Sequence, residues 1–194
     1  MERNSDTGGR DVGVRRLRLK MEAPVPALFP SSGPIRSLLV GEAPGPDNRG
    51  LPFWGDRCGR IVYRTLADLG MADVPEGAWA AWRTAALAGF RPILNQVAIT
   101  NVFDHLPMLA RGGWGAPTPE DIRADSSRLM ADVSRAWAAC PAQDLVVIAL
   151  GRTAWRTLIV LQKRLDFPVT LREVRHPSRS GRGWSDLLKA ALTQ

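Results

Sequence analysis

The chain has very little cysteine: Cys58 and Cys140 are the only two among 194 residues. Two thiols are too few for a four-thiolate zinc or iron–sulfur site. Their spacing also does not suggest the disulfide framework of a small secreted protein. We therefore expect both cysteines to be reduced packing residues, and we expect no metal site.

Long apolar segments are missing as well. No apolar run approaches the ~18 residues that a membrane span requires. The basic N-terminus is not followed by the apolar core of a signal peptide. These absences predict a soluble, cytoplasmic protein with no membrane partner.

Acidic residues are the minority among the charged ones. The chain has 26 Lys plus Arg against 19 Asp plus Glu, a net charge of +7 and a pI of about 10.6. The excess is concentrated near the C-terminus, where residues 150–194 contain nine basic and three acidic side chains. A basic end suits a polyanion such as nucleic acid. Coding sequences rich in arginine codons commonly produce a similar excess of basic residues, so charge alone does not decide the function.

The length suits one domain. Residues 1–32 are polar, basic and then proline-rich without periodicity, which predicts a flexible or loosely docked N-terminal arm. Residues 33–194 are the predicted domain, in which apolar strands alternate with helices. The predicted strands are 35–41, 96–100, 144–150 and 168–174. The predicted helices are 57–69, 77–87, 117–139, 152–164 and a last one from about Trp184.

This alternation predicts a single-domain, three-layer α/β/α fold with a central, mostly parallel four-stranded sheet. In open α/β sheets, ligands bind beyond the carboxyl ends of the strands. The segments expected at that edge are "GEAPGPD" after the first strand, Asn101 and Asp104 after the second, "GRT" after the third and "RHPSRSG" after the fourth.

These strand ends contain the groups required to hydrolyse the glycosidic bond between a flipped-out nucleobase and its sugar. Phe53 offers an apolar face for stacking, and the amide of Asn101 suits the N3–H and O4 edge of uracil. His176 can donate to a carbonyl oxygen and stabilise the charge that spreads into the base. Glu42 and Asp47 are the nearby carboxylates that could orient water. Taken alone, Asn101 could equally cap a turn, and Glu42 could brace its loop.

The motifs "GEAPGPD…GLPFWG", "ITNVF", "PTPEDI", "VVIALGRTAW" and "HPS" resemble, in order and approximate spacing, the uracil-DNA glycosylase superfamily. The likeness extends from about Leu38 to Ser180 and is nearest to family 4, the thermostable iron–sulfur branch. It implies a base-binding set of Gly41, Glu42, Ala43, Phe53, Asn101 and His176. It also implies that Ser178, Arg179, Ser180 and Gly181 form a loop that enters the duplex and holds phosphates. The basic side chains Arg175, Arg179 and Arg182 flank "HPS" and would meet phosphates if DNA docks there, although they could also be a solvated face.

The departures from the family pattern also carry predictions. His105 and Asp125 stand where family 4 has cluster-ligating cysteines, so we expect no iron–sulfur cluster and no cofactor. The loop before "GLPF" is about two residues shorter, which removes the acidic run that would position water. Asp47 is the best remaining candidate, with Asn48 or Glu42 as substitutes. The segment "HLPMLARGGWGAP" lacks the nucleophilic His of the branch that binds uracil covalently, so covalent capture is not expected.

The sequence therefore predicts a monomeric, monofunctional uracil-DNA glycosylase that begins base excision repair and releases free uracil. Asp47, His176 and Glu42 are its predicted catalytic residues. Three alternatives remain: a glycosylase for hypoxanthine or xanthine, a protein that binds uracil-containing or damaged DNA without cutting it, and a nucleotide-binding module. The last fits poorly because no glycine-rich phosphate fingerprint follows a strand.

Overall fold

The computed structural model describes residues 23–48, 50–107, 113–179 and 183–193. Its centre is a four-stranded sheet in the order β4-β1-β5-β6, in which all neighbouring strands are parallel. This confirms the predicted fold class. The strands are β1 (Ser37–Gly41), β4 (Val97–Asn101), β5 (Val146–Leu150) and β6 (Thr170–Val174). A separate antiparallel pair joins β2 (Ala72–Asp73) to β3 (Ile93–Leu94).

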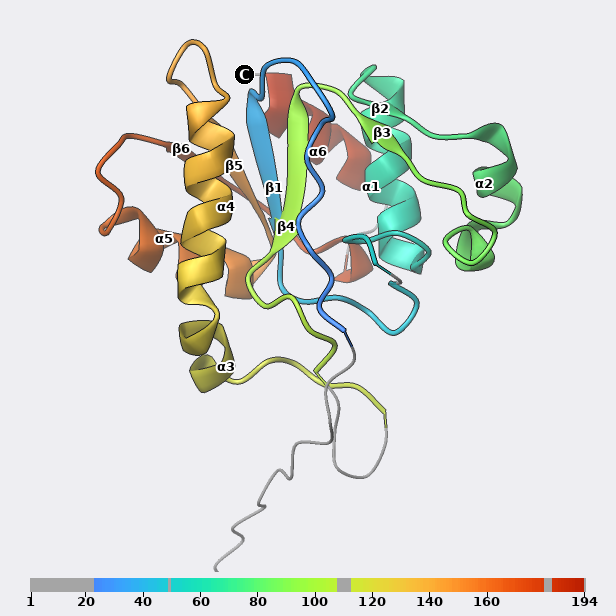
Figure 1. Ribbon diagram of the computed structural model, residues 1–194, viewed down its shortest axis with the longest axis horizontal. Helices are drawn as coiled ribbons and strands as arrows, with labels where there is room; N and C mark the ends of the chain where they lie inside the picture. The colour runs from blue at the N-terminus through green and yellow to red at the C-terminus, as the bar shows by residue number, and fades with distance from the viewer. Residues whose placement is uncertain (1–22, 49, 108–112, 180–182, 194) are drawn as a thin grey trace, which may run out of the picture.

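Helices cover both faces of the sheet, as Figure 1 shows. Alternation along the strands sends Leu39 and Ile99 to one face and Leu38 and Val40 to the other. The first face packs on α1 (Arg57–Asp68) and α6 (Trp184–Thr193), and the short helix α2 (Glu76–Ala80) adds Ala78 to the same apolar cluster. The second packs on α4 (Ser126–Ala138) and α5 (Arg152–Gln162). Within the described ranges, no helix has the length and apolar character to cross a membrane.

Two predicted helices are divided. The helix predicted over 77–87 consists of α2 and a 3-10 turn, η1 (Trp82–Thr84), because Trp82 turns into the core and its indole N–H donates to the carbonyl of Asp56. The helix predicted over 117–139 is capped by Thr118 at its start but breaks at Asp125 into α3 (Pro119–Ala124) and α4. The Asp125 carboxylate accepts the Asp104 N–H and two bonds from Arg128, and these contacts favour the break.

Part of the predicted N-terminal arm lies against the sheet. Leu28 and Ile99 exchange backbone hydrogen bonds of 2.8 and 2.9 Å in an antiparallel bridge, and the Val25 N–H donates to the Asp104 carbonyl at 2.7 Å. These contacts cover the outer edge of β4, which would otherwise expose unpaired backbone groups. The division of the chain at residue 32 stays a prediction.

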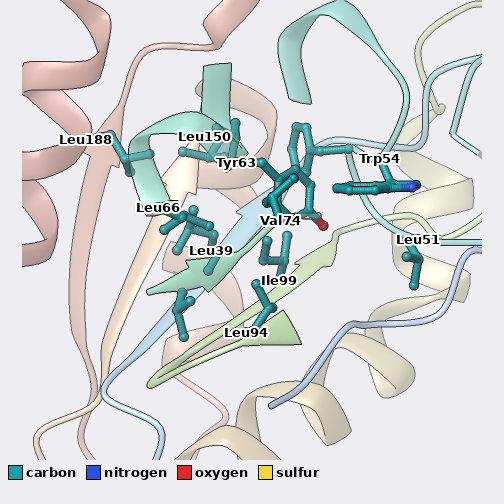
Figure 2. Close-up of a cluster of buried hydrophobic side chains, with 14 of the residues drawn as sticks. Leu39, Leu51, Trp54, Tyr63, Leu66, Val74, Leu94, Ile99, Leu150 and Leu188 are labelled. Atoms are coloured by element: carbon teal, nitrogen blue, oxygen red, sulfur yellow. The ribbon is translucent and has the colours of Figure 1, made fainter. Parts of the chain in front are cut away.

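An aromatic cluster supports the loop between β1 and α1. Trp54 and Tyr63 meet edge to face with ring centroids 5.0 Å apart, and Trp82 lies 4.8 Å from Trp54. Figure 2 shows Trp54 and Tyr63 beside the aliphatic side chains of the sheet. The Tyr63 hydroxyl donates to the carbonyl of Pro52 at 3.0 Å. Because Pro52 precedes Phe53, this buried bond fixes the backbone that carries the predicted stacking ring.

We expect Tyr63→Phe to lower the free energy of unfolding by about 1–2 kcal/mol, because the buried Pro52 carbonyl loses its donor. The ring contacts of the cluster remain in this variant. Urea denaturation followed by tryptophan fluorescence measures the change. An unchanged midpoint would show that the hydroxyl does not hold the loop.

Candidate functional site

The polar strand ends meet at one edge of the sheet, as predicted. Gly41 pairs with Asn101 in the β1–β4 register, and Leu150 pairs with Val174 in the β5–β6 register. The loops after all four strands therefore leave the sheet at the same end, which is the lower end in Figure 1. The sheet order puts the β1 end between those of β4 and β5.

Three of the predicted residues, Gly41, Phe53 and Asn101, are brought into direct contact and are called the Gly41 site below. A Cβ atom on Gly41 would lie 2.4 Å from Asn101 Oδ1 and 2.4 Å from Phe53 Cζ. Both distances are far below a van der Waals contact. Only glycine at this position leaves room for the amide and the ring to approach the same point on the backbone.

The amide of Asn101 is buried and has no partner. Asn101 is 1% exposed, and neither Oδ1 nor Nδ2 has a hydrogen-bond partner within the described part of the chain. A buried, unpaired amide costs roughly 1–3 kcal/mol of stability. Buried amides in native proteins are paired in the great majority of cases. This amide is therefore available to pair with a ligand.

Phe53 is held in an unfavourable backbone conformation. Its φ is +60°, a region that a bulky residue rarely adopts, and its side chain is 4% exposed. Helix α1 packs directly on it: a Cβ atom on Gly59 would lie 1.5 Å from the Phe53 carbonyl oxygen. The role of Gly59 was not predicted, although a signal was present in the sequence: a glycine inside a helical pattern can have a packing reason.

His176 lies over the end of β5. A Cβ atom on Gly151 would lie 3.0 Å from His176 Cβ, and the φ of Gly151 is +104°. The Nδ1 atom of His176 accepts the Ser178 N–H at 3.2 Å and lies 2.7 Å from the Ser178 hydroxyl. Because Nδ1 is an acceptor, the proton of a neutral His176 ring resides on Nε2. The N–H donor of the neutral ring is therefore on Nε2.

The loop that carries His176 is anchored beside α1. The Trp184 indole N–H donates to the Arg175 carbonyl at 2.6 Å, and the hydroxyls of Thr65 and Ser185 lie 3.0 Å apart. Within this loop, Arg175 and Ser178 are exposed, and Arg179 belongs to the 3-10 turn η2 (Pro177–Arg179). The predicted DNA contacts Ser180 and Arg182 lie outside the described residues.

The two predicted carboxylates differ in their surroundings. Glu42 directly follows Gly41 and is half-buried, and its carbonyl accepts the Phe103 N–H at 3.1 Å. Ala43 follows it and is also half-buried. Asp47 is exposed on a turn that the Asn48 N–H closes onto the Gly45 carbonyl at 3.0 Å. The structure does not bring Asp47 into the Gly41 site.

Asn48, a substitute candidate for activating water, has a bracing role. It is buried; its Oδ1 accepts the Gly45 N–H at 2.8 Å, while its Nδ2 donates to the Trp54 carbonyl at 3.2 Å and to Asp56 Oδ2 at 3.1 Å. Its amide is therefore fully used by the loop. Among the weighed candidates, only Glu42 and Asp47 keep a side chain free to orient water.

Asp56, which the sequence analysis did not single out, connects the loop to α1. It caps the helix by accepting the Gly59 N–H and also accepts from Asn48. Burial raises the pKa of the Asp56 carboxyl above its ordinary value, and these hydrogen bonds oppose the shift. A side chain at Gly45 would point at Asp56, because its Cβ would lie 3.3 Å from Asp56 Oδ2.

The donor set does not fit an iron–sulfur cluster. His105 Nδ1 lies 2.5 Å from Asp104 Oδ1, and Asp125 is bound to Arg128, so both positions have protein partners. Burial raises the pKa of Cys58 to about 11, which keeps that thiol protonated, and Cys140 is buried beyond the far end of α4. No group of three or more metal-ligating side chains occurs among the described residues.

Comparison with known proteins identifies the family. The fold is similar to the crystal structure of wild-type SMUG2 from Pedobacter heparinus, with a TM-score of 0.52 and 13% sequence identity over 81% of this chain and 74% of that chain. No curated protein matches the sequence. Residues 30–194 match the sequence model of the uracil DNA glycosylase superfamily. The chain belongs to this superfamily, which supports a DNA glycosylase of base excision repair with DNA as its partner. Assignment to family 4 stays a prediction.

Proposed function

We propose that this protein is a monofunctional glycosylase that removes uracil from DNA. The observation that carries the proposal is the buried, unpaired amide of Asn101 against the bare backbone of Gly41 and the ring of Phe53. An amide offers one donor and one acceptor in a plane, which matches the O4 and N3–H of uracil. Cytosine presents the opposite pattern at this edge and would meet the amide donor with its own amino group.

In the proposed reaction, water attacks C1′ of the deoxyribose and the bond between C1′ and N1 of uracil breaks. The electron pair leaves with the base as a uracil anion, which is later protonated, and DNA keeps an abasic site. The Nε2–H of His176 donates to the uracil O2 and stabilises this charge. Asp47 orients the water and stabilises the positive charge on the sugar, and Glu42 is the second carboxylate for that role.

Base binding requires a small local movement. Because Phe53 is only 4% exposed, the ring face that would stack on uracil is covered in this structure. The turn at Asp47 and the backbone at Gly50, with φ +77°, lie in the same loop between β1 and α1. A shift of this loop would uncover the ring and bring Asp47 closer to the sugar.

The test is cleavage of a labelled oligonucleotide with one uracil, followed by alkali and a denaturing gel. We expect His176→Ala and Asp47→Ala each to lower the single-turnover rate by roughly a hundredfold, the scale of one lost catalytic donor or charge. Glu42→Gln, assayed beside Asp47→Ala, identifies which carboxylate orients water. Thermal unfolding of each variant controls for folding, and Ser178→Ala tests the contact between the Ser178 hydroxyl and His176 Nδ1.

A second function is favoured by one observation: the Asp47 carboxylate is exposed, and among the described residues no hydrogen bond or ion pair holds it near the Gly41 site. A protein without a positioned carboxylate could bind uracil-containing DNA and not cut it. The same preparation distinguishes these functions, because retardation of uracil-containing DNA without cleavage supports binding alone. Cleavage of oligonucleotides containing hypoxanthine or xanthine, with uracil left intact, would replace the proposed substrate.

A further inference from the structure

A partly buried ionic cluster lies behind the Gly41 site, on the opposite face of β4. We call it the Arg128 cluster: Arg128, Asp104, Asp125, Asp132 and Thr100. The Arg128 Nε lies 3.0 and 2.9 Å from the two Asp125 oxygens, and Nη1 donates to Asp132 Oδ2 at 2.5 Å. Nη1 also donates to the Thr100 hydroxyl at 3.1 Å, and Asp104 Oδ2 lies 3.5 Å from Nε. The cluster joins α4 to the end of β4.

The remaining contact of the guanidinium is with the residue that reads the base. Arg128 Nη2 donates to the backbone carbonyl of Asn101 at 2.6 Å. The next N–H along the chain, that of Val102, donates to the Gly41 carbonyl at 2.9 Å. The peptide unit between Asn101 and Val102 is therefore held at both ends, by α4 on one side and by β1 on the other.

This anchoring matters because the Asn101 side chain has no hydrogen bond of its own in the described chain. Successive side chains of a strand point to opposite faces, so Thr100 faces α4 and Asn101 faces Phe53. The direction of the Asn101 amide is thus set by its backbone and by packing against Gly41 and Phe53. A hydrogen bond that fixes this peptide plane fixes the direction of the amide.

Arginine is required for this arrangement. One guanidinium reaches Asp125, Asp132, Thr100 and the Asn101 carbonyl together because its donors form a rigid, planar fork. A lysine ammonium keeps the positive charge but is a compact donor that cannot span these acceptors. Asp125 lies at the break between α3 and α4, where its carboxylate pairs with Arg128. The break is therefore part of the geometry of the cluster.

We propose that Arg128 is a positioning residue that orients the Asn101 amide toward the base and so supports uracil recognition. The inference rests on the proposed function. A purely structural role, in which the cluster only joins α4 to the sheet, makes a different prediction. It would lower stability without changing the turnover of the folded protein.

The experiment compares Arg128→Lys with Arg135→Lys, the same substitution on the same helix. The Arg135 guanidinium lies over the Phe29 ring, 4.0 Å from its centroid and away from the end of β4. Loss of the Arg135 guanidinium therefore tests only how α4 packs. We expect Arg128→Lys to lower kcat on uracil DNA by about tenfold and to weaken inhibition by free uracil to a similar extent. The KM for DNA should stay within about twofold, because the phosphate contacts are elsewhere. Arg135→Lys should leave all three quantities unchanged.

A second variant tests the same role if Arg128→Lys does not fold. Asp125→Asn keeps the arginine but weakens its bidentate hold on Nε, and we expect kcat and uracil inhibition to fall together by a few-fold. If folded Arg128→Lys or Asp125→Asn has wild-type kcat and uracil inhibition, the positioning role is wrong and the cluster is structural. A wild-type protein that cleaves no uracil DNA overturns the proposed function itself, and this inference with it.

Discussion

Gly41→Ala is expected to abolish uracil excision while the protein stays folded. The new methyl group would lie 2.4 Å from both Asn101 Oδ1 and Phe53 Cζ, so the amide and the ring must move apart from the backbone that they now contact. Displacing groups that position a substrate by about 1 Å costs on the order of a hundredfold, and two are displaced here. We therefore expect kcat/KM to fall by at least about a thousandfold.

The matched control for this prediction is Gly45→Ala, in the same loop. Its methyl group would face Asp56 Oδ2 at 3.3 Å and point away from the Gly41 site, so a much smaller loss is expected. Single-turnover cleavage and binding of DNA that contains an abasic site separate loss of base recognition from loss of DNA binding. Excision by Gly41→Ala within tenfold of wild type would place base recognition elsewhere.

Asn101→Leu is expected to inactivate the protein and to stabilise its fold. Both amide atoms of Asn101 are buried without a partner, so replacement by an apolar side chain of similar shape removes a desolvation cost of about 1–3 kcal/mol. The same replacement removes the group that reads the base. Sites built to hydrogen-bond a substrate lose roughly 10⁴-fold or more when the pairing is lost, so excision of uracil should become undetectable.

Asn48→Leu provides the opposite case. Both asparagines are buried, but the Asn48 amide is fully engaged with Gly45, Trp54 and Asp56. We expect this variant to lose about 2–3 kcal/mol of stability because three buried or partly buried partners lose their hydrogen bonds. Urea denaturation of both variants measures the contrast. A destabilised Asn101→Leu variant would mean that the amide supports the fold and is not reserved for a ligand.

Local patterns in the sequence account for most of the architecture. The strands β1, β4 and β5 are nearly continuous aliphatic runs, so they predict a sheet covered on both faces. The alternation with helices makes the strands parallel and brings their carboxyl ends to one edge. Thr118 and Pro119 mark the start of a helix, because capping interactions act within one turn of the chain and are visible in the local sequence.

The errors in the prediction have a common cause, which is contact between segments distant in sequence. Asp125 interrupts a helix that its periodicity predicts as continuous, because its carboxylate accepts the backbone N–H of Asp104 from the segment after β4. Trp82 ends α2 early because its indole reaches Asp56. Helix periodicity reports which face is apolar, and it contains no information about a partner from another element.

The sequence by itself determined the fold class, the edge of the sheet that carries the site, and the residue types available there. Only the tertiary structure decided which of those residues meet. It brings Gly41, Phe53 and Asn101 into contact. It uses the side chains of Asn48 and Asp56 to brace the loop and leaves Asp47 exposed. It also places Arg128 behind Asn101. The physical reason is that periodicity and capping act between near neighbours, whereas packing of distant segments decides that the Arg128 guanidinium reaches the Asn101 carbonyl and that the Asn101 amide faces Gly41 and Phe53.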